Sequence, residues 1–120
     1  GVPVGLASDI SGGNSLSMMS IIAGAIQASK MKWLETNKEL APLTFSEGFY
    51  LATKGGGSFF GKVGSFEEDY DFDALVIDDS SLSDIKELTI EERLQKFIYI
   101  GDDRNIIARY VKGRKIEKPF

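Results

Sequence analysis

Asp9 is the acidic residue of the sequence that is best placed to do chemistry. It follows the apolar run of residues 2–7 after one intervening residue, Ser8, and Gly12 and Gly13 come shortly after it. The run predicts a short strand over residues 2–6 that is buried on both faces, as strands of parallel sheets are. Ligands bind at the carboxyl ends of such strands, where a carboxylate can bind a metal or move a proton. An Asx turn or a helix N-cap suits an aspartate here equally well, so the local pattern leaves both interpretations open.

Two other segments resemble known ligand-binding loops but lack residues that those loops require. Residues 56–63 read Gly-Gly-Ser-Phe-Phe-Gly-Lys-Val, so Val63 stands where a phosphate-binding loop needs a hydroxyl for Mg²⁺. Residues 69–73 offer the alternating carboxylates of an EF-hand loop, but Ala74 and Ser80 replace its glycine and its bidentate glutamate. We interpret the first segment as a helix stop with a tight turn and the second as a solvated acidic turn.

Clustered charges elsewhere are interpreted as features of turns and of a solvated face. Two pairs of adjacent aspartates are Asp78-Asp79 and Asp102-Asp103. Adjacent side chains diverge, so neither pair is expected to share a proton, and both are predicted to form turns. Four basic residues lie near the end of the sequence: Lys112, Arg114, Lys115 and Lys118. No aromatic residues alternate with them in the pattern of a nucleic-acid binder, so we interpret them as an exposed face of a hairpin.

The composition excludes several kinds of site. The 120 residues contain no Cys and no His, so the chain alone cannot build a Ser-His-Asp site or a zinc centre with nitrogen or sulfur ligands. A net charge of -4 argues against nucleic acid as a partner. No stretch approaches the roughly 18 apolar residues of a membrane span, so no membrane partner is expected. The lack of Cys fits a cytoplasmic protein.

The helices that must position Asp9 can be predicted from periodicity and capping. A broad apolar pattern predicts a helix over residues 16–34 that packs on more than one side. Thr44 and Thr89 are each followed three residues later by a glutamate, which is the pattern of a capping box. We therefore expect further helices over residues 44–53 and 89–99, the first ending near the glycines at 55–57.

Three strands are predicted besides the one before Asp9. Residues 72–77 have strand character, and residues 106–116 fit a β-hairpin in which Gly113 supplies the positive φ of the turn. None of these lies close in sequence to residues 2–6, whose predicted strand needs neighbours on both sides. We therefore expect the chain to be a piece of a longer protein.

Residues 8–18 read Ser-Asp-Ile-Ser-Gly-Gly-Asn-Ser-Leu-Ser-Met and resemble the last metal-binding segment of guanine deaminases, in the amidohydrolase superfamily. The resemblance covers nearly the whole chain in order. It continues through residues 43–44, 52–56, 64–67, 71–74, 101–106 and 110–114. The most specific part is Gly-Asp-Asp-Arg-Asn-Ile at 101–106, which distinguishes guanine deaminases from related amidohydrolases. Ser8 departs from the pattern, since Thr is common at that position.

The resemblance implies an α/β fold, as the C-terminal piece of a metal-dependent hydrolase (β/α)₈ barrel with a small β-sandwich. Residues 1–60 would contain the eighth strand, the eighth helix and the closing helices. Residues 61–120 would form the C-terminal portion of the sandwich, with an inserted helix.

The function implied by the resemblance is hydrolysis of guanine to xanthine and ammonia, with Zn²⁺ as cofactor. Asp9 matches a residue that binds the metal and takes a proton from water. The family's other ligands, its general acid and its purine contacts come from earlier strands. We therefore expect this chain alone to be inactive, to bind no Zn²⁺ and to self-associate, or its parent to be a homo-oligomer.

Two alternatives remain open at this point. The chain could belong to another amidohydrolase that acts on cytosine or on a triazine, because the residues that would contact the substrate are not in it. It could also be a self-contained, non-catalytic interaction module, which would require residues 2–6 to pair within these 120 residues.

Overall fold

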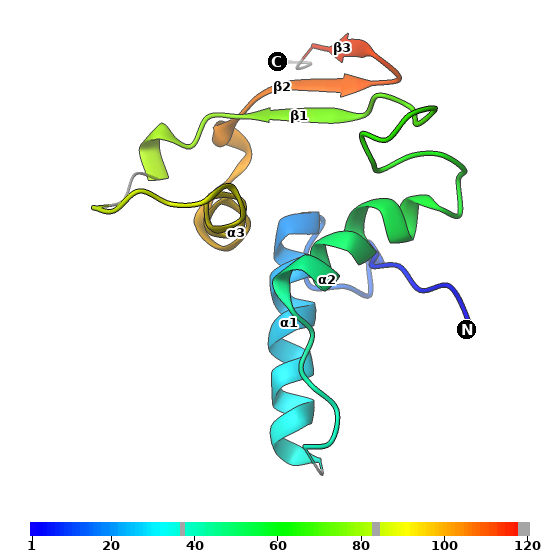
Figure 1. Ribbon diagram of the computed structural model, residues 1–120, viewed down its shortest axis with the longest axis vertical. Helices are drawn as coiled ribbons and strands as arrows, with labels where there is room; N and C mark the ends of the chain where they lie inside the picture. The colour runs from blue at the N-terminus through cyan, green and yellow to red at the C-terminus, as the bar shows by residue number, and fades with distance from the viewer. Residues whose placement is uncertain (37, 83–84, 118–120) are drawn as a thin grey trace.

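The structure is a computed structural model that describes residues 1–36, 38–82 and 85–117. A three-stranded sheet lies at one end of the molecule and a group of helices at the other (Figure 1). The longest helix, α1 (Met18–Glu35), confirms the helix predicted over residues 16–34. It begins after Ser17, and it buries Ile22 and Ile26 against its neighbours.

Helix α2 (Phe45–Tyr50) begins at the capping box that the sequence predicts. The Thr44 hydroxyl accepts a hydrogen bond from Glu47 N at 3.2 Å, and the Glu47 carboxylate accepts one from Thr44 N at 2.8 Å. The helix packs closely on α1 through Gly48, because a Cβ there would lie 3.4 Å from the Ile26 side chain.

The prediction that this helix ends near residues 55–57 is confirmed, because helical backbone continues to Gly57 and a turn follows over residues 58–60. After α2 the chain continues as a π-helix, η1 (Leu51–Gly55), and Ser58 N still donates to Lys54 O at 3.0 Å. The glycines at 55–57 therefore form the end of the helix. A hydrogen-bonded turn from Gly57 O to Phe60 N at 2.8 Å follows.

Helix α3 (Ile90–Ile100) also begins at its predicted capping box, formed by Thr89 and Glu92. It buries Phe97 and Ile98 on the side that faces α1. Two short 3₁₀ helices flank it in sequence: η2 (Ser80–Leu82) and η3 (Asp103–Asn105).

The sheet consists of β1 (Ala74–Ile77), β2 (Ile106–Val111) and β3 (Arg114–Ile116), antiparallel and in that order. A bulge lies between Val76 and Ile77 of β1. The turn between β2 and β3 has φ of 49° at Lys112 and 76° at Gly113, which matches the right-handed twist of a tight hairpin. The strand and hairpin predicted over residues 72–77 and 106–116 are thus confirmed.

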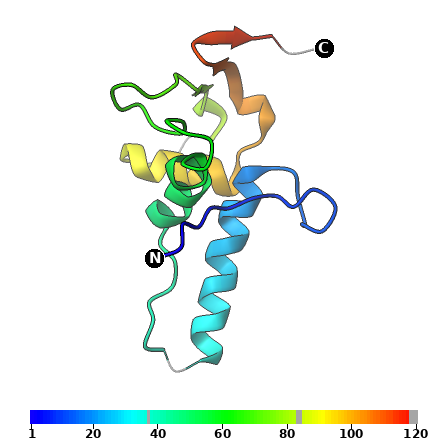
Figure 2. The same cartoon turned by 90° about the vertical axis from the view of Figure 1, so that its right-hand side faces the viewer.

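The predicted strand over residues 2–6 does not form in this structure. The segment runs beside η1 and the start of α1 (Figure 2), and Leu6 N donates to Leu51 O at 3.0 Å. Val2 is 87% exposed and Val4 62% exposed, which contradicts the expected burial on both faces. A strand requires neighbouring strands, and the described residues place none beside this segment.

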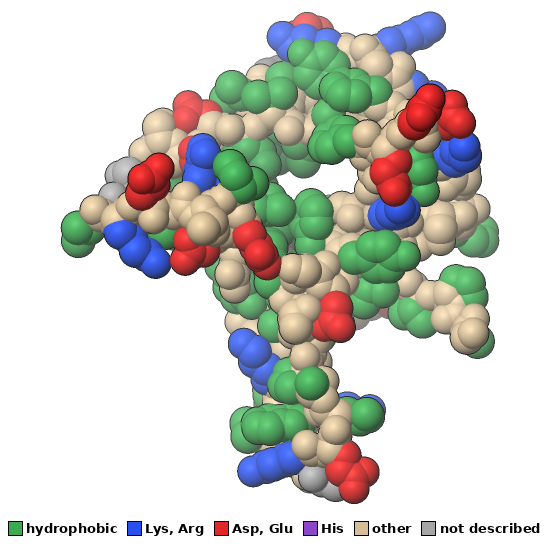
Figure 3. All heavy atoms as spheres, in the orientation of Figure 1, with side chains coloured by type: hydrophobic (Ala, Val, Ile, Leu, Met, Phe, Trp, Pro, Cys, Tyr) green, Lys and Arg blue, Asp and Glu red, His purple; other side chains and the backbone are tan. Residues whose placement is uncertain are grey.

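The apolar core is small for a chain of this size. Only Ile22, Ile26, Phe97 and Ile98 are buried apolar residues among those described. The accessible surface is 9079 Å², whereas a compact monomer of this mass exposes about 6,400 Å². The radius of gyration is 15.7 Å, against about 13.6 Å for a compact domain. Figure 3 shows the corresponding hollow between the sheet and the helices, with apolar side chains around it.

Candidate functional site

Asp9 lies at the end of the N-terminal segment, which is fixed by its backbone. Besides the hydrogen bond from Leu6 N to Leu51 O, Gly5 lies directly against the end of η1. A Cβ on Gly5 would be 2.6 Å from Gly56 Cα, so the approach requires a glycine. The segment is thus held three residues before Asp9.

A tight turn follows Asp9 and leaves its carboxylate free. The Asp9 carbonyl oxygen accepts hydrogen bonds from Gly12 N at 2.7 Å and Gly13 N at 3.2 Å. Asp9 has φ of 51° and Ile10 has φ of 22°, a region that aspartate adopts more readily than a β-branched residue does. Such strained backbone is often found at functional sites.

The structure argues against a local role of the Asp9 side chain in an Asx turn or as a helix N-cap. Ser17, not Asp9, is the N-cap residue of α1. The turn uses the Asp9 carbonyl, and no described residue donates a hydrogen bond to its exposed carboxylate. The carboxylate is therefore available to a ligand.

The described residues do not form a metal site by themselves. They contain no group of three or more His, Cys, Asp and Glu residues that could hold a metal ion. A catalytic Zn²⁺ ion takes three protein ligands and leaves one position open. Asp9 fits one of these positions, because its carboxylate is exposed and free of hydrogen bonds from the described residues, and the remaining ligands would have to come from elsewhere.

Several of the other acidic residues are engaged within the chain. Asp79 and the guanidinium of Arg93 form two hydrogen bonds, of 2.7 and 2.9 Å, and this contact lowers the pKa of the Asp79 carboxyl. Asp78 Oδ1 accepts from Ser80 N at 2.9 Å, which confirms its predicted place in a turn. Asp102 accepts from both the side chain and the backbone of Arg104, and these hydrogen bonds lower its pKa to about 2.

The acidic segment at residues 69–73 is tied to basic partners rather than arranged around a cation. Lys62 Nζ lies 3.1 Å from Asp69 Oδ2, and Lys112 Nζ lies 3.5 Å from Asp71 Oδ2. Asp73 Oδ1 accepts from Lys112 N at 2.8 Å, which connects the hairpin to the start of β1. Arg114 and Lys115 are exposed, as predicted for a hairpin face, while Lys118 lies outside the described residues.

Asn105 is a buried polar residue that the analysis of local motifs missed. Its side chain accepts from Asp102 N at 3.0 Å and donates to Asp78 O at 2.9 Å and Ser81 Oγ at 3.0 Å. It thereby joins η3 to the end of β1. Its place in the family-specific segment at 101–106 was the only signal in the sequence, because its partners Ser81 and Asp78 lie 24 and 27 positions away.

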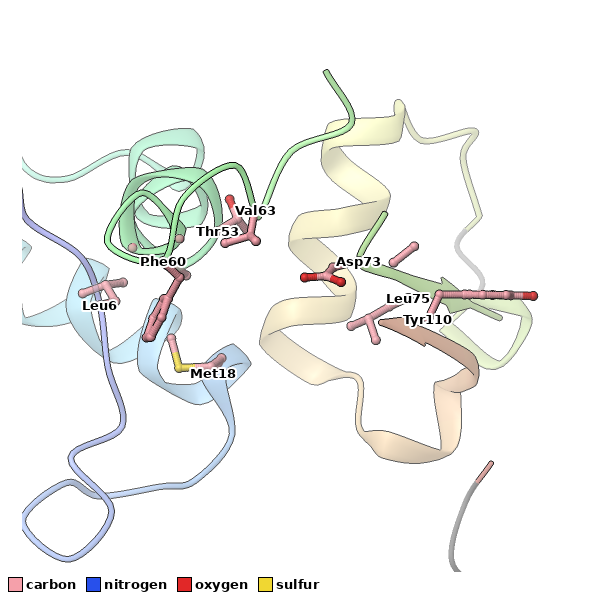
Figure 4. A pocket seen from close by; sticks show the side chains of 13 residues that line it. Leu6, Met18, Thr53, Phe60, Val63, Asp73, Leu75 and Tyr110 are labelled. Carbon is pink, nitrogen blue, oxygen red and sulfur yellow. The ribbon is translucent and has the colours of Figure 1, made fainter. Parts of the chain in front are cut away.

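An apolar cavity of about 460 Å³ lies between the helices and the sheet. Leu6, Met18 and Phe60 line one side of it, and Leu75 and Tyr110 line the other (Figure 4). Asp9 is not among the residues that line it. The cavity is therefore separate from Asp9, the candidate metal ligand.

None of the helices in the described part of the chain has the length and hydropathy of a membrane span.

Comparisons with known proteins identify relatives along nearly the whole chain. Guanine deaminase of Dictyostelium discoideum is 41% identical over 97% of this chain and 27% of its own length. Guanine deaminase of Homo sapiens is 38% identical over 96% of this chain and 28% of its own length. The chain thus spans about a quarter of the length of these relatives.

Solved structures agree with these sequence relatives. A crystal structure of guanine deaminase from C. acetobutylicum, with guanine bound in its active site, is 60% identical and matches 95% of this chain with a TM-score of 0.90. The chain covers 27% of that structure. E. coli guanine deaminase is 26% identical and matches 99% of this chain with a TM-score of 0.80. The model of the amidohydrolase family matches residues 1–116, and the chain therefore belongs to the amidohydrolase family.

Proposed function

We propose that this chain is the C-terminal part of a guanine deaminase, which hydrolyses guanine to xanthine and ammonia. The observation that carries the proposal is the match, at 60% identity and a TM-score of 0.90, to a guanine deaminase whose active site holds guanine. The shared segment extends over 95% of this chain, including residues of both the helical end and the sheet. The substrate of the whole protein would therefore be a purine.

The proposal assigns residues 1–60 to the end of a (β/α)₈ barrel and residues 61–120 to a small β-sandwich. The N-terminal segment and α1 would be the eighth strand and helix of the barrel. The exposure of Val2 and Val4 supports this assignment, because both would be covered by neighbouring strands. Met31 and Leu34 of α1 are also more than half exposed, as expected of a helix whose other contacts are missing.

Asp9 is the residue of this chain that we propose to act in the reaction. At the end of the eighth strand it would provide one oxygen ligand to Zn²⁺ and accept a proton from water. Its two oxygens can do both because no described residue donates a hydrogen bond to them. The remaining ligands would come from the other strands of the barrel, so the 120 residues alone would hold neither Zn²⁺ nor activity.

The idea of a self-contained interaction module is not supported by the structure. It required residues 2–6 to pair as a strand within the chain, and the described residues give that segment one backbone hydrogen bond, from Leu6 N to Leu51 O.

Ammonia release by the full-length protein tests the proposal. We expect turnover with guanine and far less with cytosine or a triazine, and no turnover with the 120-residue chain and added Zn²⁺. Asp9→Asn should reduce kcat by at least about a hundredfold, since it removes a ligand and a proton acceptor.

The matched control is Asp69→Asn, since Asp69 is also an exposed carboxylate with positive φ, at 66°. It should keep the activity of the unchanged protein. A preference for cytosine or a triazine over guanine, or full activity of Asp9→Asn, would contradict the proposal.

A further inference from the structure

The turn after Asp9 contains Gly12 and Gly13, and a Cβ at these two positions would contact different groups. A Cβ on Gly12 would lie 2.5 Å from Asp9 Oδ2 and 3.3 Å from Asp9 Cγ. A Cβ on Gly13 would lie 1.7 Å from the carbonyl oxygen of Ser8. The first contact is with the end of a side chain, and the second is with the backbone.

The two contacts differ in how they can be relieved. A side chain at position 13 can be accommodated only if the backbone of the turn moves. A side chain at position 12 can be accommodated if the Asp9 carboxylate rotates to another position, which leaves the backbone in place. Gly12 is not among the residues with positive φ, so its backbone conformation is open to alanine.

Nothing else among the described residues fixes the Asp9 carboxylate. No hydrogen bond or ion pair from these residues reaches it, in contrast to Asp79 and Asp102. Its position therefore depends on the space that the turn leaves above Gly12. A ligand of a metal ion has to be held in one orientation, and small displacements weaken binding.

We propose that Gly12 is a positioning residue for the Asp9 carboxylate, because the absence of a side chain at position 12 leaves the space that the carboxylate occupies. The proposal rests on the proposed role of Asp9 as a ligand. Gly13 has a different function, which is to let the backbone turn close.

The experiment compares four variants of the full-length protein: Gly12→Ala, Gly13→Ala, Gly24→Ala and Asp9→Asn. Gly24 is the control, because it lies in α1 and a Cβ there would meet no atom within 4 Å. For each variant the affinity for Zn²⁺ is measured by competition with a chelator. The unfolding midpoint is measured by circular dichroism on the metal-free protein, and kcat and KM are measured with guanine.

Gly12→Ala should weaken Zn²⁺ binding by about 10- to 100-fold, the usual effect of disturbing the groups that orient a metal ligand. It should lower kcat with little change in KM, and its metal-free unfolding midpoint should match that of the unchanged protein. Gly13→Ala should lower the unfolding midpoint clearly.

Two results would overturn the inference while the role of Asp9 stands. The first is unchanged Zn²⁺ affinity in Gly12→Ala when Asp9→Asn has lost it. The second is a drop in the unfolding midpoint of Gly12→Ala as large as that of Gly13→Ala, because the glycine would then serve the backbone. Wild-type Zn²⁺ affinity in Asp9→Asn would instead refute the proposed function itself.

Discussion

At the scale of single residues, Asp9 differs from five engaged carboxylates in having no partner among the described residues. The others cap helices or pair with cations. These are Glu47, Glu67, Asp79, Glu92 and Asp102. The place of Asp9 after an apolar run was visible in the sequence. That its carboxylate stays free was not, because this depends on which groups the fold brings near it.

The pair of Asp102 and Arg104 predicts a pH dependence. The guanidinium and backbone N–H of Arg104 lower the pKa of the Asp102 carboxyl from its ordinary value of 3.8 to about 2. Because the pKa is lower in the folded protein, the stabilisation is complete above pH 3.8 and is lost as the pH falls toward 2.

Carboxyl NMR of Asp102 should therefore give a midpoint near 2. In Arg104→Ala the midpoint should rise only part of the way back, because the backbone N–H at position 104 still donates to Asp102. A midpoint at the ordinary value in the unchanged protein would show that the ion pair does not form.

Asn105 should be important for stability. Asn105→Ala removes three hydrogen bonds and leaves the carbonyl of Asp78 and the N–H of Asp102 without this partner. We expect a loss of about 2 kcal/mol in the free energy of unfolding, measured by denaturant titration. Ser81→Ala is the matched control, since it removes only one of the three bonds and Ser81 is exposed. Equal losses in the two variants would contradict this role of Asn105.

At the scale of elements, the sequence predicts well what is decided locally. Both capping boxes and the hairpin turn at Gly113 depend on residues within a few positions of each other, and all three form as expected. The π-helix η1 was not predicted. The Leu51 carbonyl oxygen accepts from Gly56 N and also from Leu6 N, which lies 45 positions earlier. The strand predicted over residues 2–6 is absent from this structure for the same reason, because its formation depends on distant strands.

The capping box of α3 provides a test at this scale. Thr89→Ala removes the hydroxyl that accepts from Glu92 N at 3.2 Å, and it should lower the free energy of unfolding by about 1 kcal/mol. Thr89→Ser keeps a hydroxyl in place and should recover most of that loss. The box would be irrelevant to stability if the serine and alanine variants unfolded at the same denaturant concentration.

The contact between Gly5 and η1 provides a second test at the scale of elements. Gly5→Ala would place a Cβ 2.6 Å from Gly56 Cα and should separate the segment from η1. The amide hydrogen of Leu6 should then exchange faster by on the order of tenfold, the equivalent of one hydrogen bond. Gly24→Ala is the control and should leave the exchange rate at Leu6 unchanged. An unchanged rate in Gly5→Ala as well would show that this contact does not hold the segment.

At the scale of the whole molecule, the main feature is the excess of exposed surface. The chain exposes about 2,700 Å² more than a compact monomer of its mass, and several large apolar residues are more than 75% exposed. These are Val2, Ile10, Leu40, Phe59, Phe60, Phe66 and Ile85. The composition gave no sign of this, because hydrophobic content does not say which residues find partners within the chain.

This surface predicts that the isolated 120-residue chain self-associates. Exposed apolar patches of this extent are uncommon on soluble monomers and promote association. Sedimentation velocity should show species larger than 13.2 kDa that increase with concentration, together with binding of an apolar dye. A monomer at high concentration that binds no dye would contradict the prediction.

We propose that Asp9 provides one ligand to the metal of a deaminase whose other ligands lie outside this chain. The most direct measurement is a crystal structure of the full-length protein with Zn²⁺, located by its anomalous scattering. We predict an Asp9 carboxylate oxygen at about 2.0–2.2 Å from the ion. A fully ligated Zn²⁺ ion with the Asp9 carboxylate turned away from it would contradict the account.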